Sequence, residues 1–244
     1  MIGKVICGEA IETMKSIPDK AIDMILCDLP YGTTACSWDT IIPFEPLWES
    51  YKRIIKDNGA IVLTASQPFT SALVMSNPDM FKYCWYWKKE RLTNPLISHY
   101  MPGKVIEDIC VFYKNLPTYN PIRTKYFGKL VTNNAKGNHG ETTSKTTKVT
   151  NYKDDGSRSP IQLLEFKRDV RTLNLHPTQK PVALFEYLIK TYTNENDLVL
   201  DNCCGSGTTG RACKNLNRRF IEIELDPTYA RIAEERLKQG VLNF

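Results

Sequence analysis

The sequence contains no long uninterrupted apolar run, at its N-terminus or elsewhere, so no membrane-spanning helix is predicted and we expect a cytoplasmic protein. Its eight cysteines include no Cys-x-x-Cys pair and its three histidines complete no ligand spacing, which argues against a zinc site. The cysteines are therefore expected to be reduced packing residues. No Gly-Lys-Ser or Gly-Lys-Thr follows a glycine-rich loop, which excludes the phosphate-binding loop of nucleoside triphosphatases.

The composition is that of an ordinary globular protein, with 42% hydrophobic and 24% charged residues. The positive charge, however, is concentrated in one segment. Residues 114–171 include twelve basic and five acidic side chains, a local charge of +7, although the whole chain carries only +5. Such a segment suits a polyanionic partner, and a solvated surface loop is the alternative.

Strand and helix patterns alternate along the chain outside this basic segment. Short apolar runs predict strands at 21–28, 60–65, 83–87, 105–113, 198–201 and 219–224. Helical spacing predicts helices at 44–56, which Asn58-Gly59 would stop, at 182–191 and at 227–239, and a further helix that follows a glycine-rich turn and ends at residue 215. This alternation predicts an α/β fold with a mostly parallel sheet. Because residues 115–171 show no clear period, we expect an insertion there between two halves of one core, at 1–114 and 172–244.

A glycine-rich loop between Gly205 and Gly210 follows the predicted strand at 198–201, and Glu224 ends the next strand. Such glycines let backbone N–H groups approach a ligand, and a carboxylate on the neighbouring strand can bind ribose hydroxyls, as in dinucleotide-binding domains. A nicotinamide cofactor is disfavoured because only one more strand and helix follow the loop. Asp201 would also repel a pyrophosphate, whereas it would attract an ammonium group. A structural turn without a ligand is the remaining alternative.

The tetrapeptide Asp28-Leu29-Pro30-Tyr31 follows the first predicted strand, at the carboxyl edge of the sheet where open α/β proteins bind ligands. It resembles the D-P-P-Y motif of amino-directed DNA methyltransferases, in the form found in N6-adenine enzymes rather than the S-P-P-Y of N4-cytosine enzymes. For the tetrapeptide alone, a plain β-turn is the alternative. The order of parts, with the tetrapeptide first, the basic segment second, residues 176–181 third and the glycine loop last, resembles the circularly permuted β class of that family.

This resemblance implies a Rossmann-like fold that binds S-adenosylmethionine, with helices on both faces of the sheet and an inserted target-recognition region. It also implies methyl transfer to N6 of adenine in double-stranded DNA, with N4 of cytosine as the alternative. Asp28 and the carbonyl of Leu29 or Pro30 would accept the two amino hydrogens, so that the nitrogen lone pair can attack the methyl group. Tyr31 would stack on the base once it is flipped out of the duplex. No metal is required.

The same resemblance assigns the cofactor site to the glycine loop, to the segment before the helix at 182–191 and to two glutamates. Its predicted residues are Glu9, Thr178, Gln179, Lys180, Asp201, Cys203, Gly205, Ser206, Gly207, Thr208 and Glu224. The loop residues would line the methionine part, and the segment at 178–180 would lie near its carboxylate. Glu224 would bind the ribose and Glu9 would lie near the adenine. Glu222 stands where glycine is usual in the family and shares a strand face with Glu224, so the two can be confused.

Candidates for DNA contact come from two places. Three basic residues beyond the strand at 83–87 can reach phosphates or form a solvated edge, namely Lys88, Lys89 and Arg91. The candidates in the basic insertion are Arg123, Lys145, Lys148 and Arg158. Double-stranded DNA is the expected partner, and a homodimer is compatible with the β class. A DNA-binding protein without catalysis and a nicotinamide oxidoreductase are the rival functions.

Overall fold

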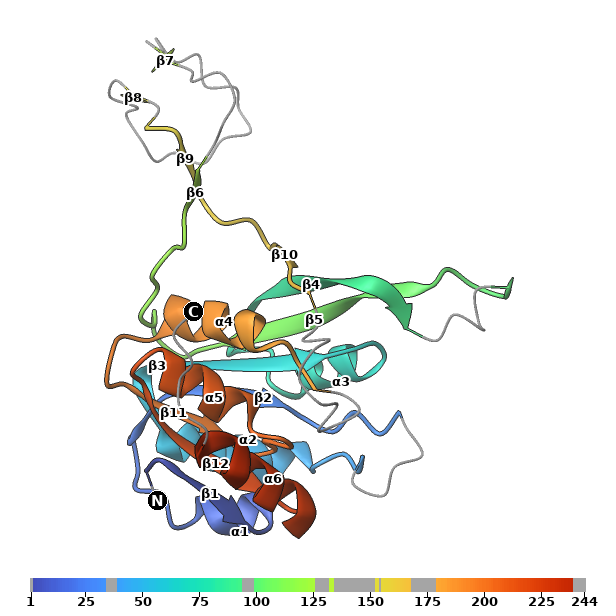
Figure 1. The fold of residues 1–244 in the computed structure, drawn as a ribbon, viewed down its shortest axis with the longest axis vertical. Coiled ribbons are helices and arrows are strands. Elements are labelled where there is room, and N and C mark those ends of the chain that lie inside the picture. The colour runs from blue at the N-terminus through green and yellow to red at the C-terminus, as the bar shows by residue number, and fades with distance from the viewer. Residues whose placement is uncertain are drawn as a thin grey trace. The chain divides into compact units, whose positions relative to one another are not determined.

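A computed structural model describes residues 2–33, 39–93, 99–125, 132–133, 152–153, 155–167 and 179–238. The chain divides into two compact units, one of Met1–Asn120 with Gln162–Phe244 and a smaller one of Pro121–Ile161. The larger unit therefore keeps both ends of the segment that the sequence assigned to an insertion at 115–171. Figure 1 shows the elements of each unit.

The larger unit is built on an eight-stranded sheet in the order β1-β12-β11-β2-β3-β5-β4-β10. The strands are β1 (Lys4–Cys7), β2 (Ile22–Asp28), β3 (Ile55–Ala65), β4 (Phe81–Thr93), β5 (Lys104–Phe112), β10 (Leu163–Glu165), β11 (Leu198–Asp201) and β12 (Arg219–Glu224). Neighbours are parallel from β1 across to β3, whereas β5 is antiparallel to both β3 and β4. The prediction of an α/β fold with a mostly parallel sheet is confirmed.

The helices in the described part of the larger unit lie in two layers, one on each face of the sheet (Figure 1). The helices α1 (Ala10–Met14), α2 (Phe44–Ile54) and α3 (Phe69–Ser76) share one apolar core with the sheet, through residues such as Met14, Tyr51 and Leu73. The helices α4 (Val182–Tyr192), α5 (Thr208–Asn215) and α6 (Pro227–Lys238) share the other, through residues such as Leu188 and Ala233. Burial of both faces explains why the strands between them are continuous apolar runs.

The boundary between α2 and β3 differs from the prediction of a helix at 44–56 stopped by Gly59. The helix ends at Ile54, and Ile55 already pairs with Ile22 of β2. Gly59 lies within β3, where a Cβ atom would stand 2.8 Å from the carbonyl oxygen of Asp23. The glycine therefore permits a close approach of two strands rather than ending the helix.

Two edge strands were not predicted. β1 pairs in parallel with β12, and β10 pairs in parallel with β4 through Leu163 and Tyr86, although it falls within the segment predicted as an insertion. Both are short, with four and three residues, so they offer too few positions for a periodic signal.

The smaller unit contains two pairs of very short antiparallel strands. β6 (Thr124–Lys125) pairs with β9 (Ser157–Arg158), and β7 (Thr132–Asn133) pairs with β8 (Tyr152–Lys153). In the part of the chain that the structure describes, no helix has the length and apolarity needed to cross a bilayer.

Candidate functional site

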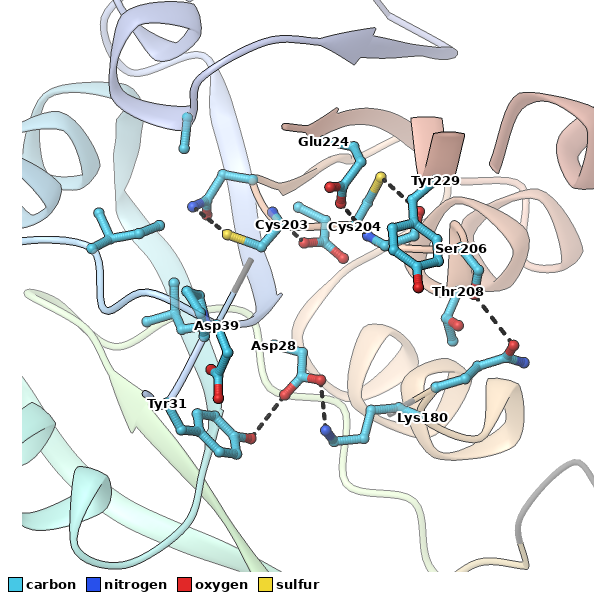
Figure 2. Close-up of a pocket in the computed structure, with 18 of the residues that line it drawn as sticks. Asp28, Tyr31, Asp39, Lys180, Cys203, Cys204, Ser206, Thr208, Glu224 and Tyr229 are labelled. Carbon is cyan, nitrogen blue, oxygen red and sulfur yellow. Dashed lines mark hydrogen bonds and ion pairs between the residues drawn. The ribbon is translucent and has the colours of Figure 1, made fainter. Parts of the chain in front are cut away.

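The carboxyl ends of three parallel strands bring the two sequence motifs together. β2 ends at Asp28 and its neighbour β11 ends at Asp201, with Ile25 in register with Leu200. β12 lies on the other side of β11 and ends at Glu224. All three carboxylates line one cavity of about 590 Å³, shown in Figure 2. The tetrapeptide near the start of the chain and the glycine loop near its end therefore meet at one edge of the sheet.

At one end of the cavity, Glu224 holds the glycine loop. Its Oε2 accepts the backbone N–H of Gly205 at 2.7 Å (Figure 2). Its Oε1 accepts the backbone N–H of Asp226 at 2.9 Å. A carboxylate can accept about four hydrogen bonds, so acceptor positions remain for a ligand's hydroxyl groups. Gly205 adopts a φ of 53°, which favours glycine at this tight turn.

Gly207 was predicted to line the cofactor site, but it is not among the residues that line the cavity. It has a φ of 77°, and a Cβ atom there would stand 3.0 Å from the Cβ of Ala233 in α6. This glycine lets the loop pack closely against α6, and its neighbours Gly205, Ser206 and Thr208 line the cavity.

Asp201 lies against the cavity and is almost completely buried. It accepts hydrogen bonds from the N–H of Cys203 at 3.1 Å and from the hydroxyl of Thr209. Burial, only partly offset by these hydrogen bonds, raises the pKa of Asp201 to about 7. A cationic group placed beside Asp201 would stabilise its carboxylate form, which suits the ammonium of a methionine moiety.

Glu222 and Glu224 are distinguished by their surroundings. Glu222 is fully buried behind the loop, where its Oε1 accepts the N–H of Gly210 at 2.6 Å. Its Oε2 has no hydrogen-bond partner among the described residues, and burial raises the pKa of Glu222 to about 8. The raised pKa favours the protonated form of Glu222. Glu222 does not line the cavity, whereas Glu224 does.

At the other end of the cavity, Asp28 is surrounded by donors. Its Oδ1 accepts a hydrogen bond from the hydroxyl of Tyr31 at 2.8 Å, and its Oδ2 accepts one from Nζ of Lys180 at 2.6 Å (Figure 2). Oδ1 also accepts a hydrogen bond from the hydroxyl of Thr64. The Tyr31 ring stacks on Phe69 with centroids 5.2 Å apart. Leu29 and Pro30 also line the cavity, so the whole tetrapeptide contributes to this end.

The two described residues of the predicted segment 178–180 go to opposite ends of the cavity. Gln179 accepts a hydrogen bond from the hydroxyl of Ser206, in the glycine loop, at 3.2 Å. Lys180 instead binds Asp28, so the structure places it beside the tetrapeptide rather than with Gln179. Although burial disfavours its charge, the carboxylates of Asp28 and Glu107 raise the pKa of Lys180. Thr178 lies outside the described residues.

Glu9, predicted near the adenine, lines the cavity just before α1. Its Oε2 accepts the N–H of Glu12 at 2.7 Å and so caps that helix. The residues at this end fit S-adenosylmethionine: the carboxylates of Asp201 and Glu224 suit an ammonium and ribose hydroxyls, and Tyr229 offers an aromatic ring to the same wall (Figure 2). In the described part of the chain, no three histidine, cysteine or acidic side chains cluster as a metal site would need.

Sequence reasoning missed Glu107 and misplaced Lys89. Lys89, a candidate for phosphate contact, is buried against the cavity and pairs with Glu107 of β5. Lys88 points away, is half exposed and pairs with Glu165 at 2.8 Å, and Arg91 is exposed. Alternation along β4 separates Lys88 from Lys89. Both strands carry further charged residues, such as Lys88 and Asp108, so the local sequence did not single out the buried pair.

The candidates in the basic segment are only partly described. Arg123 donates to the Ser157 hydroxyl at 2.6 Å, and Arg158 donates to the carbonyl of Ser157 at 3.0 Å. In the smaller unit, Arg158 belongs to β9, and Arg123 directly precedes β6, the strand that pairs with β9. Lys145 and Lys148 lie outside the described residues.

Comparison with known proteins identifies the family. A sequence model described as DNA methylase matches residues 22–235. The type II methyltransferase M.HpaI of Haemophilus parainfluenzae is 30% identical over 99% of this chain and 76% of its own length. The DNA adenine methyltransferase YhdJ of Escherichia coli is 28% identical, over 96% of this chain and 82% of its own.

Solved structures agree with this assignment. The complex of M1.HpyAVI with S-adenosylmethionine is 26% identical, covers 96% of this chain and 98% of its own, and has a TM-score of 0.63. The cytosine-N4-specific PvuII DNA methyltransferase has a TM-score of 0.69 over 98% of this chain and 87% of its own, and at 16% identity it supports the fold alone. With Asp28 and the glycine loop on one cavity, these similarities show that the chain belongs to the N6/N4 family of S-adenosylmethionine-dependent DNA methyltransferases.

Proposed function

We propose that the protein methylates N6 of adenine in double-stranded DNA. The choice of adenine rests on the resemblance of Asp28-Leu29-Pro30-Tyr31 to the motif of N6-adenine enzymes, and the observation that carries the transfer to an amino group is the hydrogen bonding of Asp28. Its Oδ1 already accepts two hydrogen bonds and its Oδ2 accepts one, from Lys180. Because a carboxylate accepts about four, one position remains, on the oxygen that Lys180 also binds. Asp28 lines the cavity, so this position is available to one hydrogen of an exocyclic amino group.

An exocyclic amino nitrogen is a poor nucleophile because its lone pair is delocalised into the ring. If Asp28 accepts one hydrogen and the carbonyl of Leu29 or Pro30 accepts the other, the nitrogen becomes pyramidal and its lone pair is free to attack. When bound, S-adenosylmethionine would supply an electrophilic methyl group, which the amino nitrogen would take as the bond between that carbon and sulfur breaks. The nitrogen then loses one proton, and Oδ2 of Asp28 is the acceptor we propose for it.

Tyr31 is proposed to stack on the extruded base. Its hydroxyl is bonded to Asp28, and its ring lies against Phe69 on one side, so the ring is held in place before the base arrives. Preorganisation of this kind lowers the entropic cost of orienting the two reactants.

At the cofactor end, we assign Asp201 to the ammonium of the methionine moiety and Glu224 to the ribose hydroxyls. The methionine carboxylate is assigned to the neighbourhood of Ser206 and Gln179, whose side chains are hydrogen-bonded to each other across the cavity wall. Further cavity-lining residues at this end are Glu9, Cys203, Gly205 and Thr208. For DNA contact we keep Lys88, Arg91, Arg123 and Arg158 as candidates.

One experiment tests the proposed reaction. The protein is incubated with labelled S-adenosylmethionine and mixed-sequence duplex DNA, and the DNA is then digested to nucleosides. Label in N6-methyladenosine supports the proposal, and label in N4-methylcytosine would replace adenine by cytosine as the target. The absence of any transfer would favour a DNA-binding protein without catalysis.

The Asp28→Ala variant assigns the chemistry to the site. We expect at least a hundredfold loss of turnover, because an acceptor used in the transition state is removed. Binding of S-adenosylmethionine should change little, since Asp28 lies at the other end of the cavity from the Glu224 carboxylate. Turnover within a few-fold of wild type would falsify the role of Asp28.

A further inference from the structure

Four charged side chains of alternating sign line the tetrapeptide end of the cavity. Nζ of Lys180 lies 2.6 Å from Oδ2 of Asp28 and 3.5 Å from Oε2 of Glu107, and Nζ of Lys89 pairs with Oε1 of Glu107. The side chains of Lys180, Glu107 and Lys89 are only 7%, 12% and 5% exposed. The order along this charge chain is thus Asp28, Lys180, Glu107 and Lys89.

Charges so deeply buried are expensive to desolvate, and apolar side chains of similar size often give equal or greater stability. The exposed pair of Lys15 and Glu12, with both side chains about two-thirds exposed, carries no such penalty. The buried charge chain therefore calls for an explanation other than stability. It ends on Asp28, the residue to which we assign acceptance of the base's amino hydrogen.

The position of the Lys180 ammonium determines whether an acceptor position of Asp28 remains available to the base. An ammonium group has three N–H donors on a flexible stem and no fixed direction. Unopposed, it could move to the other lone pair of Oδ2 and so occupy the acceptor position that the amino group needs. Glu107, at 3.5 Å, is too far for a strong hydrogen bond but draws the ammonium toward itself and away from that position.

We propose that Glu107 is a positioning residue of the methyl transfer: through Lys180 it keeps one acceptor position of Asp28 open for the target amino group. The proposal rests on the function proposed above. Lys89 supplies the second positive charge, so that Glu107 is itself paired on its other oxygen. The Lys180 ammonium also lies 5.7 Å from the centre of the Tyr31 ring, which confines it further.

The test compares Glu107→Gln with Asp108→Asn. Asp108 is the next residue of β5, does not line the cavity and accepts a hydrogen bond from Thr70, so its variant removes one carboxylate from the same strand outside the site. For E107Q we expect kcat to fall roughly ten- to a hundredfold, the scale of a misplaced catalytic group. The Kd for S-adenosylmethionine should stay within about twofold, and D108N should keep a kcat near wild type.

A double-mutant cycle shows whether Glu107 acts through Lys180. If it does, E107Q combined with Lys180→Gln is no slower than K180Q alone, because the ammonium that Glu107 restrains is already gone. If E107Q folds poorly, the charge-balanced Lys89→Gln E107Q double variant is measured instead, and its kcat must show the same loss.

Each outcome decides one of the two proposals. E107Q turnover within about twofold of wild type, or losses that simply multiply in the double variant, overturns the role of Glu107. If D28A is inactive while E107Q is fully active, the proposed function stands and only the positioning role is wrong. If D28A keeps near-wild-type turnover, the assigned role of Asp28 is wrong and the positioning role of Glu107 is wrong with it, whereas the proposed methylation itself fails only if wild type labels no N6-methyladenosine.

Discussion

Glu222 is expected to make the stability of this protein depend on pH in the neutral range. The carboxyl is fully buried against the loop glycines, and burial, with the nearby Asp201 as a further cause, raises its pKa from an ordinary 4.5 to about 8. Between these two values the unfolded chain has released the proton and the folded protein still holds it. Stability therefore falls as the pH rises through this window, by up to about 1.4 kcal/mol per pH unit.

The magnitude between pH 6 and pH 8 follows from these values. The two pH units lie inside the window, and the slope flattens near the folded pKa, so Glu222 weakens the folded state by about 2 kcal/mol over this interval. For a chain of this size, that corresponds to roughly 4–8 °C in Tm. The Glu222→Gln variant has no titrating group at this position, because a glutamine amide is neutral at every pH used. The amide oxygen of the glutamine can still accept the N–H of Gly210.

The assay is urea or thermal unfolding of wild type and E222Q at pH 6 and pH 8. Between pH 6 and pH 8, the free energy of unfolding should fall by about 2 kcal/mol more for wild type than for E222Q. This comparison does not depend on how far the two proteins differ in stability at a single pH. Glu12→Gln, at an exposed position, serves as the control and should follow wild type. Unfolding curves of wild type and E222Q that shift in parallel would show that Glu222 is ionised in the folded protein, and the reasoning would be refuted.

Two further predictions concern ligands. Because burial raises the pKa of Asp201 to about 7, the fraction of Asp201 in the carboxylate form increases roughly tenfold between pH 6 and pH 8, and the affinity for S-adenosylmethionine should rise with it. Calorimetric titrations should show a smaller rise in affinity for the Asp201→Asn variant. Equal pH dependence of wild type and variant would contradict the assignment. If Arg123 and Arg158 contact phosphates, the R123Q R158Q double variant should lower the slope of log affinity for DNA against log salt by about 1.8, measured by anisotropy. The exposed Lys15→Gln variant should leave that slope unchanged, and an unchanged slope in the double variant would remove both arginines from the interface.

The sequence alone predicted most of the elements that build the catalytic core. Apolar runs at 21–28, 198–201 and 219–224 became β2, β11 and β12 with ends within one residue of the prediction. The motifs at Asp28 and Gly205 were located because each follows such a strand, and parallel strands end at the same edge of a sheet. These features depend on local periodicity, which a sequence displays directly.

Local patterns were weaker where one residue's role depended on a distant neighbour. The stretch at 55–59 looked like a helix end with a glycine stop, but the pairing of Ile55 with Ile22 draws it into β3. Gly207 had the features of a ligand-binding glycine, and only the approach of Ala233 from α6 shows what it accommodates. Glu222 and Glu224 occupy the same strand face, so the choice between them required the loop packed over that strand.

The arrangement around Asp28 was decided by tertiary structure. Lys180 and Glu107 are 152 and 79 residues away from Asp28 along the chain, and nothing in their local sequence indicates that they share a cavity with it. They meet because β5 runs antiparallel in the sheet, which places Glu107 near the same edge as the end of β2, and because the segment before α4 crosses that edge. Local sequence specifies which strand ends are polar, whereas pairing between buried charges arises only when those strands are brought side by side.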